Sequence, residues 1–144
     1  MMTFPVILNT KGIQKIIRPL TYPLPPMTPV HAPVLYHEVL DGLQLQPGAT
    51  VIDATLGLGG HAHALLEAIG PGGHLLGFEW DARNRELAAA ALHDFSNYEI
   101  IPASFAGMHA ACTERGIGSV DAILMDLGIS SPHLDDAERG FSFR

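Results

Sequence analysis

The sequence predicts an open α/β sheet in which parallel strands alternate with helices. Short apolar runs predict strands over residues 50–54, 74–78, 98–102 and 120–125. Between them, apolar residues at helical spacing predict helices over residues 61–69, 84–94 and 105–115. Strands that alternate with helices imply parallel crossovers and a single open sheet. Hydrophobic residues make up 47% of the chain and charged residues 16%, which supports a buried core.

The boundaries of these elements follow from prolines and glycines. Pro33 can open a first helix that runs to about Leu43, because a proline at the first helical position loses no hydrogen bond. Pro47-Gly48 then predicts a turn before the first strand. The run from Gly70 to Gly73 ends the second helix, and Gly116 ends the last one.

Residues 1–30 differ in composition from the rest and are called the leader below. They contain six of the eleven prolines, three basic residues and no acid. Proline fixes φ and removes a backbone donor, so Pro23 to Pro29 excludes a regular helix or a central strand. We expect an extended or disordered leader. We favour the interpretation that the leader is an upstream extension and that Met27, rather than Met1, is the true start of the protein. A solvated tail is the alternative. A transit peptide agrees least with the composition of the leader.

Charge and cysteine usage restrict the class of protein. The net charge is −7, and it is −10 from His31 onward, which argues against a module that coats DNA or RNA. Apolar runs fall short of the roughly 18 residues that a membrane span requires. Cys112 is the single cysteine, so no internal disulfide can form and no oxidising compartment is implied. We expect a cytoplasmic protein that binds neither membranes nor DNA.

Unusual residues gather where the predicted strands end, which is where open α/β sheets bind ligands. The glycines of Asp53-Ala-Thr-Leu-Gly-Leu-Gly-Gly-His61 permit positive φ and leave helix N–H groups free for a ligand. Glu79 ends the second strand and can accept hydrogen bonds from two ribose hydroxyls. The spacing of these residues leaves NAD and S-adenosylmethionine both open.

Two carboxylates favour the cationic ligand. Asp53 lies at the tip of the first strand and Asp126 at the tip of the fourth. Carboxylates at these positions would attract an ammonium or sulfonium group and would repel a pyrophosphate. S-adenosylmethionine therefore suits the predicted site better than a dinucleotide.

Four blocks of sequence together resemble the RsmH/MraW family, the bacterial 16S rRNA (cytosine-N4)-methyltransferases. The resemblance covers residues 31–144. The blocks are HAPVLYHEVL over 31–40, DATLGLGGH over 53–61, DLGISSPHLD over 126–135 and ERGFSF over 138–143. It implies a class I, Rossmann-like methyltransferase fold, of which residues 31–144 form the cofactor-binding N-terminal half of the sheet. It also implies S-adenosyl-L-methionine as methyl donor, a cytidine in the decoding region of 16S rRNA as substrate, and the small ribosomal subunit as partner.

Site residues carry over from the resemblance by position. Gly59, Gly60 and His61 fall on the loop at the methionine part of the cofactor. Glu79 falls at the ribose position, where the family commonly has aspartate, and Phe105 falls beside the adenine. The remaining two positions are Asp126, near the donor, and His133, where the family commonly has glutamine. No catalytic residue is assigned.

Several of these residues also have a plain structural interpretation. Phe105 could be a core residue at a helix start, which is the preferred interpretation from the sequence alone, and His133 could be a loop residue without a ligand. His61 and His63 lack a third ligand at suitable spacing, so a metal site is rejected. Cys112 lies on an apolar helix face and is expected in the core rather than as a nucleophile.

The length of the chain affects the activity that we expect of it in isolation. Family members continue beyond Arg144 with further strands and a helical domain, so the resemblance implies a truncated enzyme with impaired activity. The strand over 120–125 would then be an unpaired sheet edge. Two other functions remain open: a non-catalytic cofactor-binding module completed by another chain, and an NAD-dependent oxidoreductase.

Overall fold

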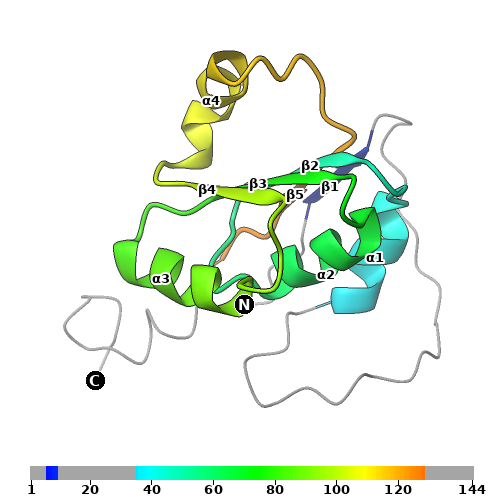
Figure 1. The fold of residues 1–144 in the computed structure, drawn as a ribbon, viewed down its shortest axis with the longest axis horizontal. Coiled ribbons are helices and arrows are strands. Elements are labelled where there is room, and N and C mark those ends of the chain that lie inside the picture. Colours follow the sequence, from blue (N-terminus) through cyan, green and yellow to red (C-terminus); the bar gives the residue numbers. More distant parts are fainter. Residues whose placement is uncertain (1–5, 10–34, 129–144) are drawn as a thin grey trace.

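A mixed β-sheet runs through the part of the chain that the computed structural model describes, residues 6–9 and 35–128 (Figure 1). These residues form five strands: β1 (Val6–Asn9), β2 (Thr50–Asp53), β3 (His74–Phe78), β4 (Tyr98–Ile101) and β5 (Ala122–Met125). Their order across the sheet is β1-β5-β2-β3-β4. The strands β5, β2, β3 and β4 are parallel, and β1 pairs antiparallel with β5. The open α/β fold predicted from the sequence is therefore confirmed.

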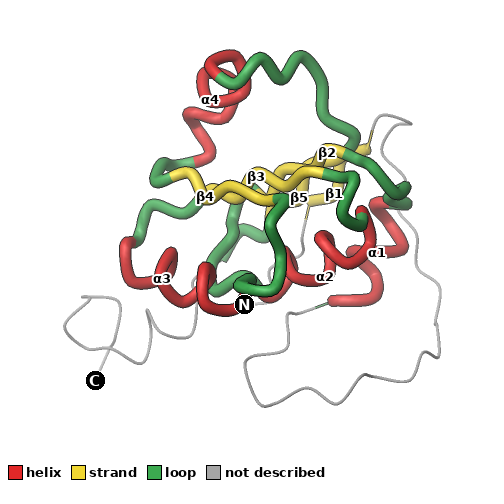
Figure 2. The backbone as a smooth tube through the Cα atoms, viewed as in Figure 1, coloured by secondary structure: helices red, strands yellow, loops and turns green. Residues whose placement is uncertain are grey.

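Helices cover both faces of this sheet (Figure 2). One face carries α1 (Tyr36–Leu43), α2 (Gly60–Ile69) and α3 (Ala82–Ala91). The opposite face carries the short 3-10 helix η1 (Phe105–Gly107) and α4 (Met108–Glu114).

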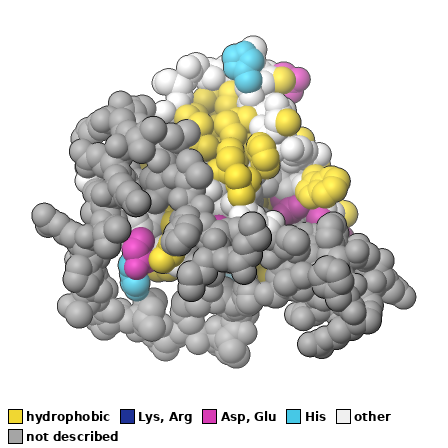
Figure 3. All heavy atoms as spheres, turned by 180° about the vertical axis from the view of Figure 1, so that it is seen from behind, with side chains coloured by type: hydrophobic (Ala, Val, Ile, Leu, Met, Phe, Trp, Pro, Cys, Tyr) yellow, Lys and Arg dark blue, Asp and Glu magenta, His cyan; other side chains and the backbone are white. Residues whose placement is uncertain are grey.

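The core is divided by the sheet in the same way. Alternate residues of a strand point to opposite faces, so Val51 and Leu75 pack with the α2 side chains, whereas Ile52 and Leu76 pack on the α4 side. Seen from behind, apolar side chains gather in the half of the molecule that contains α4 and the segment leading to β5 (Figure 3). Cys112 is only partly buried and packs against this second cluster.

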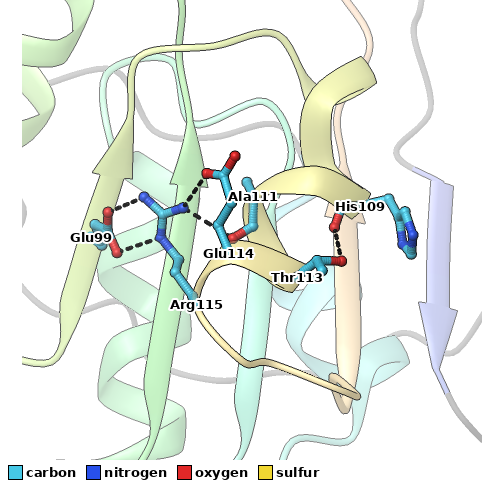
Figure 4. Close-up of polar contacts among 6 residues, drawn as sticks. All are labelled: Glu99, His109, Ala111, Thr113, Glu114 and Arg115. Atoms are coloured by element: carbon cyan, nitrogen blue, oxygen red, sulfur yellow. Dashed lines mark hydrogen bonds and ion pairs between the residues drawn. The ribbon is translucent and has the colours of Figure 1, made fainter.

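Polar contacts hold α4 against the sheet (Figure 4). The guanidinium of Arg115, which follows α4, pairs with the carboxylate of Glu99 on β4, and Arg115 Nε donates to Glu99 Oε2 at 2.8 Å. Arg115 Nη1 also donates to the carbonyl of Ala111 at 3.0 Å. The hydrogen bond from Arg115 holds the pKa of Glu99 below its usual range. Because the Arg115 and Glu99 side chains are partly solvent-exposed (28% and 44%), this pair orients α4 more than it stabilises the fold.

The strand β1 bears on two predictions. In the leader, which is predicted to be extended or disordered, residues Val6–Asn9 form the extended strand β1; the rest of the leader lies outside the described residues. The expectation that the strand over 120–125 is an unpaired edge is wrong, because Val6 pairs with Met125 and Asn9 with Ala122. Prolines dominate the composition of the leader, but the four residues VILN contain none and suit an edge strand.

Element boundaries shift by a few residues from the predicted ones. The third helix begins at Ala82 rather than at Asn84, since the Asp81 side chain caps it by accepting from the N–H groups of Arg83 and Asn84. The last helix splits into η1 and α4, and Ser104 caps η1. The first helix begins at Tyr36, later than the predicted start at Pro33.

Candidate functional site

Three carboxylates meet at the edge of the sheet where the parallel strands end. Asp53 is the last residue of β2, Glu79 directly follows β3, and Asp126 directly follows β5. The strand β2 lies between β3 and β5, and the charges of Asp126 and Glu79 both act on Asp53. The chain passes from β2 outward to β3 and β4 and then returns to β5 on the other side of β2. Such a reversal of strand order is where open α/β sheets bind ligands.

The register explains why the three carboxylates face the same way. Asp53 pairs with Gly77 on one side and with Leu124 on the other. Glu79 and Asp126 each come two residues after those partners, so by strand alternation all three side chains lie on the α2 face. Asp53 therefore lies further inside the sheet than Glu79 and Asp126, which come two residues beyond its partners. It is 1% exposed, whereas the side chain of Asp126 is 30% exposed.

Asp53 is a buried acid with an incomplete set of partners. Its Oδ1 accepts a hydrogen bond from the Thr55 N–H at 3.1 Å, and its Oδ2 is buried without a hydrogen-bond partner. Burial raises the pKa of Asp53 to about 7; the charges of Asp126 and Glu79 also raise it, and the Thr55 hydrogen bond opposes them. A cation beside Oδ2 would satisfy this oxygen and favour the ionised carboxylate.

Glu79 is held in place by the start of α3. Its Oε1 accepts from the Asp81 N–H at 2.9 Å, and its Oε2 accepts from Asn84 Nδ2 at 3.4 Å. Arg85 Nη1 donates to the carbonyls of Glu79 and Trp80, at 3.2 and 2.7 Å. The carboxylate is therefore fixed at the strand end, where it can accept hydrogen bonds from a ligand's hydroxyl groups through its remaining lone pairs.

Asp126 is tied to the loop after β2 and lies beside the first turn of α2. Its backbone N–H donates to Thr55 Oγ1 at 2.7 Å. Its Oδ2 lies 3.7 Å from His61 Nε2, which is buried and has no hydrogen-bond partner. Burial lowers the pKa of His61, and the charge of Asp126 opposes that effect. His61 is therefore neutral near pH 7, and its contact with Asp126 is polar rather than an ion pair.

The glycine loop gives α2 an open N-terminus at the same edge. Gly57 and Gly59 have φ values of +54° and +87°, in the left-handed region that glycine tolerates best. Gly59 is the N-cap of α2 and makes no side-chain cap, so the first N–H groups of the helix remain available to a ligand. A Cβ atom at Gly59 would lie 3.4 Å from the Ala88 backbone, which shows how closely α3 approaches this turn.

The predicted site residues fall in three places. Gly59, Gly60 and His61 open α2, and they lie with Glu79 and Asp126 around the same strand ends. Phe105 begins η1, one strand further along the edge, where it is 38% exposed. The preferred interpretation of Phe105 as a core residue is therefore wrong. His133 lies outside the described residues.

Two polar residues that sequence reasoning missed support the site. Thr55 bonds both Asp53 and Asp126, and Asn84 is 1% exposed and bonds Glu79. A threonine inside a glycine-rich loop and an asparagine near a helix start have common structural roles, so neither position signals a site by sequence alone.

Residues 6–9 and 35–128 contain no group of three His, Cys, Asp or Glu side chains arranged to hold a metal ion. No helix in those ranges is long and apolar enough to cross a membrane.

The sequence profile of the MraW methylase family matches residues 28–144. Ribosomal RNA small subunit methyltransferase H of Coxiella burnetii is 41% identical over 114 residues, which cover 78% of this chain and 37% of that protein. The protein of the same name from Burkholderia thailandensis is 44% identical over 114 residues, or 79% of this chain and 36% of that protein. The chain thus spans little more than a third of the length of these relatives.

The crystal structure of a protein named "putative rRNA-methylase" from Clostridium thermocellum aligns with 58% of this chain and 48% of its own, at 22% identity and a TM-score of 0.49. The family match covers most of the chain, and its range includes Asp53, Glu79 and Asp126. The resemblance seen in the sequence is confirmed: the chain belongs to the MraW methylase family.

Proposed function

We propose that the chain is the cofactor-binding part of an enzyme that transfers a methyl group from S-adenosyl-L-methionine to N4 of a cytidine in the decoding region of 16S rRNA. One observation carries the ligand choice: three carboxylates and a glycine-opened helix N-terminus share one edge of the sheet. The names of the relatives, ribosomal RNA small subunit methyltransferase H, support the rRNA substrate.

The residues present fit this cofactor. The N–H groups at the start of α2 suit the carboxylate of its methionine part. Glu79, fixed by Asp81 and Asn84, suits the two ribose hydroxyls. The carboxylates of Asp53 and Asp126 suit its positive charges. When bound, the cofactor supplies an activated methyl group.

The same charges disfavour a dinucleotide. A pyrophosphate placed on the glycine loop would bring negative charge close to the carboxylates of Glu79 and Asp126, and it would offer no cation to the unpartnered Oδ2 of Asp53. Like charges in a site of low dielectric constant repel each other strongly. An NAD-dependent oxidoreductase is therefore the weaker proposal.

The chemistry asks two things of the protein. The exocyclic amine of cytosine is conjugated with the ring, so hydrogen bonds to N4 and alignment with the methyl donor must make its electron pair available. Asp126 is the proposed polar group nearest to the reacting atoms, by its place after β5 and its exposure. Thr55 and His61 restrict how Asp126 lies.

Calorimetry on the 144-residue chain tests the cofactor. We expect S-adenosyl-L-methionine to bind and NAD to bind far more weakly. Glu79→Gln should weaken binding about tenfold, the equivalent of 1.4 kcal/mol. Glu86→Gln, on the exposed face of α3, is the matched control and should bind as the wild type does. Tighter binding of NAD than of S-adenosyl-L-methionine would overturn the proposal.

A second assay tests the reaction. Small ribosomal subunits that lack this methyl group are incubated with the chain and S-adenosyl-L-methionine, and N4-methylcytidine is measured in the digested rRNA by mass spectrometry. Because the chain spans little more than a third of its relatives, we expect little or no methylation by it alone. Methylation by a full-length relative at another nucleoside would overturn the N4-cytidine assignment.

A further inference from the structure

Asp53 differs from the other two carboxylates of the site in having an unused oxygen deep in the protein. Glu79 has partners on both oxygens, and Asp126 is partly open to solvent. Asp53 is 1% exposed, and its Oδ2 has no partner although Oδ1 has one. A buried carboxylate oxygen without a partner is costly unless a proton or another cation reaches it.

The groups that face Asp53 supply no such cation. Glu79 comes from β3 and Asp126 from β5, and both add negative charge. His61 comes from α2, and burial keeps its imidazole neutral near pH 7. In the described part of the chain, no Lys or Arg acts on Asp53. In the ligand-free protein, the charge of Asp53 is therefore neutralised most simply by a proton on Asp53 itself.

We infer that Asp53 exchanges this proton for the positively charged methionine part of the cofactor, so that each binding event releases a proton. The inference rests on the proposed function, because it takes S-adenosyl-L-methionine as the ligand. The exchange is balanced: the carboxylic acid loses H⁺ to the solvent, and the resulting carboxylate pairs with the ligand's cation. No covalent bond of the ligand changes.

The position of Asp53 explains why the exchange falls on this residue. It ends β2, which lies in the middle of the sheet, and the N–H of Thr55, two residues later, donates to its Oδ1. Burial raises the pKa of Asp53 to about 7, so the acid form predominates below neutrality. A cation that arrives between the strand ends adds a favourable charge next to Oδ2 and returns the pKa to a lower value.

Calorimetry in buffers of different ionisation enthalpy counts the protons released. With a pKa near 7, Asp53 is about three-quarters protonated at pH 6.5, so the wild type should release about 0.8 proton there and under about 0.1 at pH 8.5. Asp53→Asn should lose this release. The titrating groups of the ligand and His61 contribute alike to both proteins, so the difference between them isolates Asp53.

Asp121→Asn is the matched control. Asp121 lies at the opposite end of the same sheet, where its Oδ2 accepts from the Thr50 N–H at 2.8 Å. It should release the same number of protons as the wild type. The wild type should also lose about tenfold more affinity than Asp53→Asn between pH 8 and pH 6.

Two further measurements make the outcome decisive. S-adenosylhomocysteine keeps the ammonium group and lacks the sulfonium; equal proton release assigns the partner of Asp53 to the ammonium, and loss of release assigns it to the sulfonium. Infrared difference spectra of the wild type need no variant: ligand binding should remove the C=O band of a protonated carboxyl group. Binding with equal proton release by wild type and Asp53→Asn, or with no change in that band, overturns the inference. Absence of binding to the wild type would instead contradict the proposed function.

Discussion

Thr55 and Asp126 are joined by a hydrogen bond of 2.7 Å from the Asp126 backbone N–H to the Thr55 hydroxyl, across 71 residues of sequence. This bond connects the loop after β2 to the end of β5, which are the two strand ends at the reversal of strand order. The N–H of the same threonine donates to Asp53. Thr55 thus sets the spacing between two carboxylates of the site.

Thr55→Val should weaken both the fold and the site. The variant keeps the shape of the side chain but leaves the Asp126 N–H without its partner, which costs about 1–3 kcal/mol of unfolding free energy. We expect cofactor affinity to fall about fivefold, because Asp126 is no longer held. Urea denaturation and calorimetry measure the two effects. Thr55→Ser retains the hydroxyl and should restore both; failure of Ser to do so would show that the methyl group matters instead.

Gly59→Ala should damage the turn into α2. A non-glycine residue at φ +87° is strained by about 1–2 kcal/mol, and the new Cβ would contact Ala88 at 3.4 Å. The turn would open, and the helix N-terminus would move away from the carboxylates. We expect lower thermal stability and at least tenfold weaker cofactor binding.

Gly118→Ala is the control for that substitution. Gly118 lacks a positive φ, and a Cβ there would meet nothing within 4 Å. Its unfolding free energy should stay within about 0.5 kcal/mol of the wild type. An equal loss in both variants would contradict the role of the turn.

Asp53→Asn should change how stability depends on pH. The pKa of Asp53 is raised to about 7 in the folded protein, above its ordinary value of 3.8. Between these values the folded state holds the proton that the unfolded state has lost, so this group makes stability fall as pH rises from about 4 to 7. The loss is on the order of 4 kcal/mol and persists above pH 7.

Asn does not titrate, so Asp53→Asn lacks this loss. The difference in unfolding free energy, variant minus wild type, should therefore be more positive at pH 8 than at pH 5. Chemical denaturation at the two pH values measures the difference. Asp121→Asn should not reproduce it. A constant offset between wild type and Asp53→Asn across the range would contradict the raised pKa.

Asn84→Ala should show whether Asn84 supports cofactor binding through Glu79 or only stabilises the fold. The Asn84 side chain is buried and donates to Glu79 Oε2, so its loss frees one oxygen of the carboxylate. We expect a loss of about 1–2 kcal/mol in unfolding free energy and cofactor binding about fivefold weaker. Differential scanning fluorimetry and calorimetry give the two values. Unchanged affinity in a destabilised protein would make Asn84 purely structural.

Local patterns in the sequence were sufficient for the parallel strands. Residues 74–78 form β3 with the predicted bounds, since a short apolar run between a glycine turn and an acidic loop has few other structures open to it. The sequence also predicts that the glycine loop, Glu79 and Asp126 gather at one edge, and the structure brings them together there, because strand ends in an α/β sheet share one edge. The predicted start of α3 at Asn84 is wrong by two residues. The apolar pattern marks only the buried face of the helix, whereas the Asp81 cap sets its first residue at Ala82.

What the sequence by itself determined is the family, the alternation of strands and helices, and the acids that end the strands. Only the tertiary structure decided which of these acids is buried and what surrounds it. Asp53 and Asp126 look alike in sequence, yet Asp53 lies one step deeper and keeps an unpartnered oxygen, whereas Asp126 reaches solvent. It also decided that β1 covers the edge of β5 and that Thr55 and Asn84 hold the carboxylates. The pairing of β1 with β5 and the Thr55–Asp126 hydrogen bond join segments far apart in the sequence, and a local pattern does not encode such contacts.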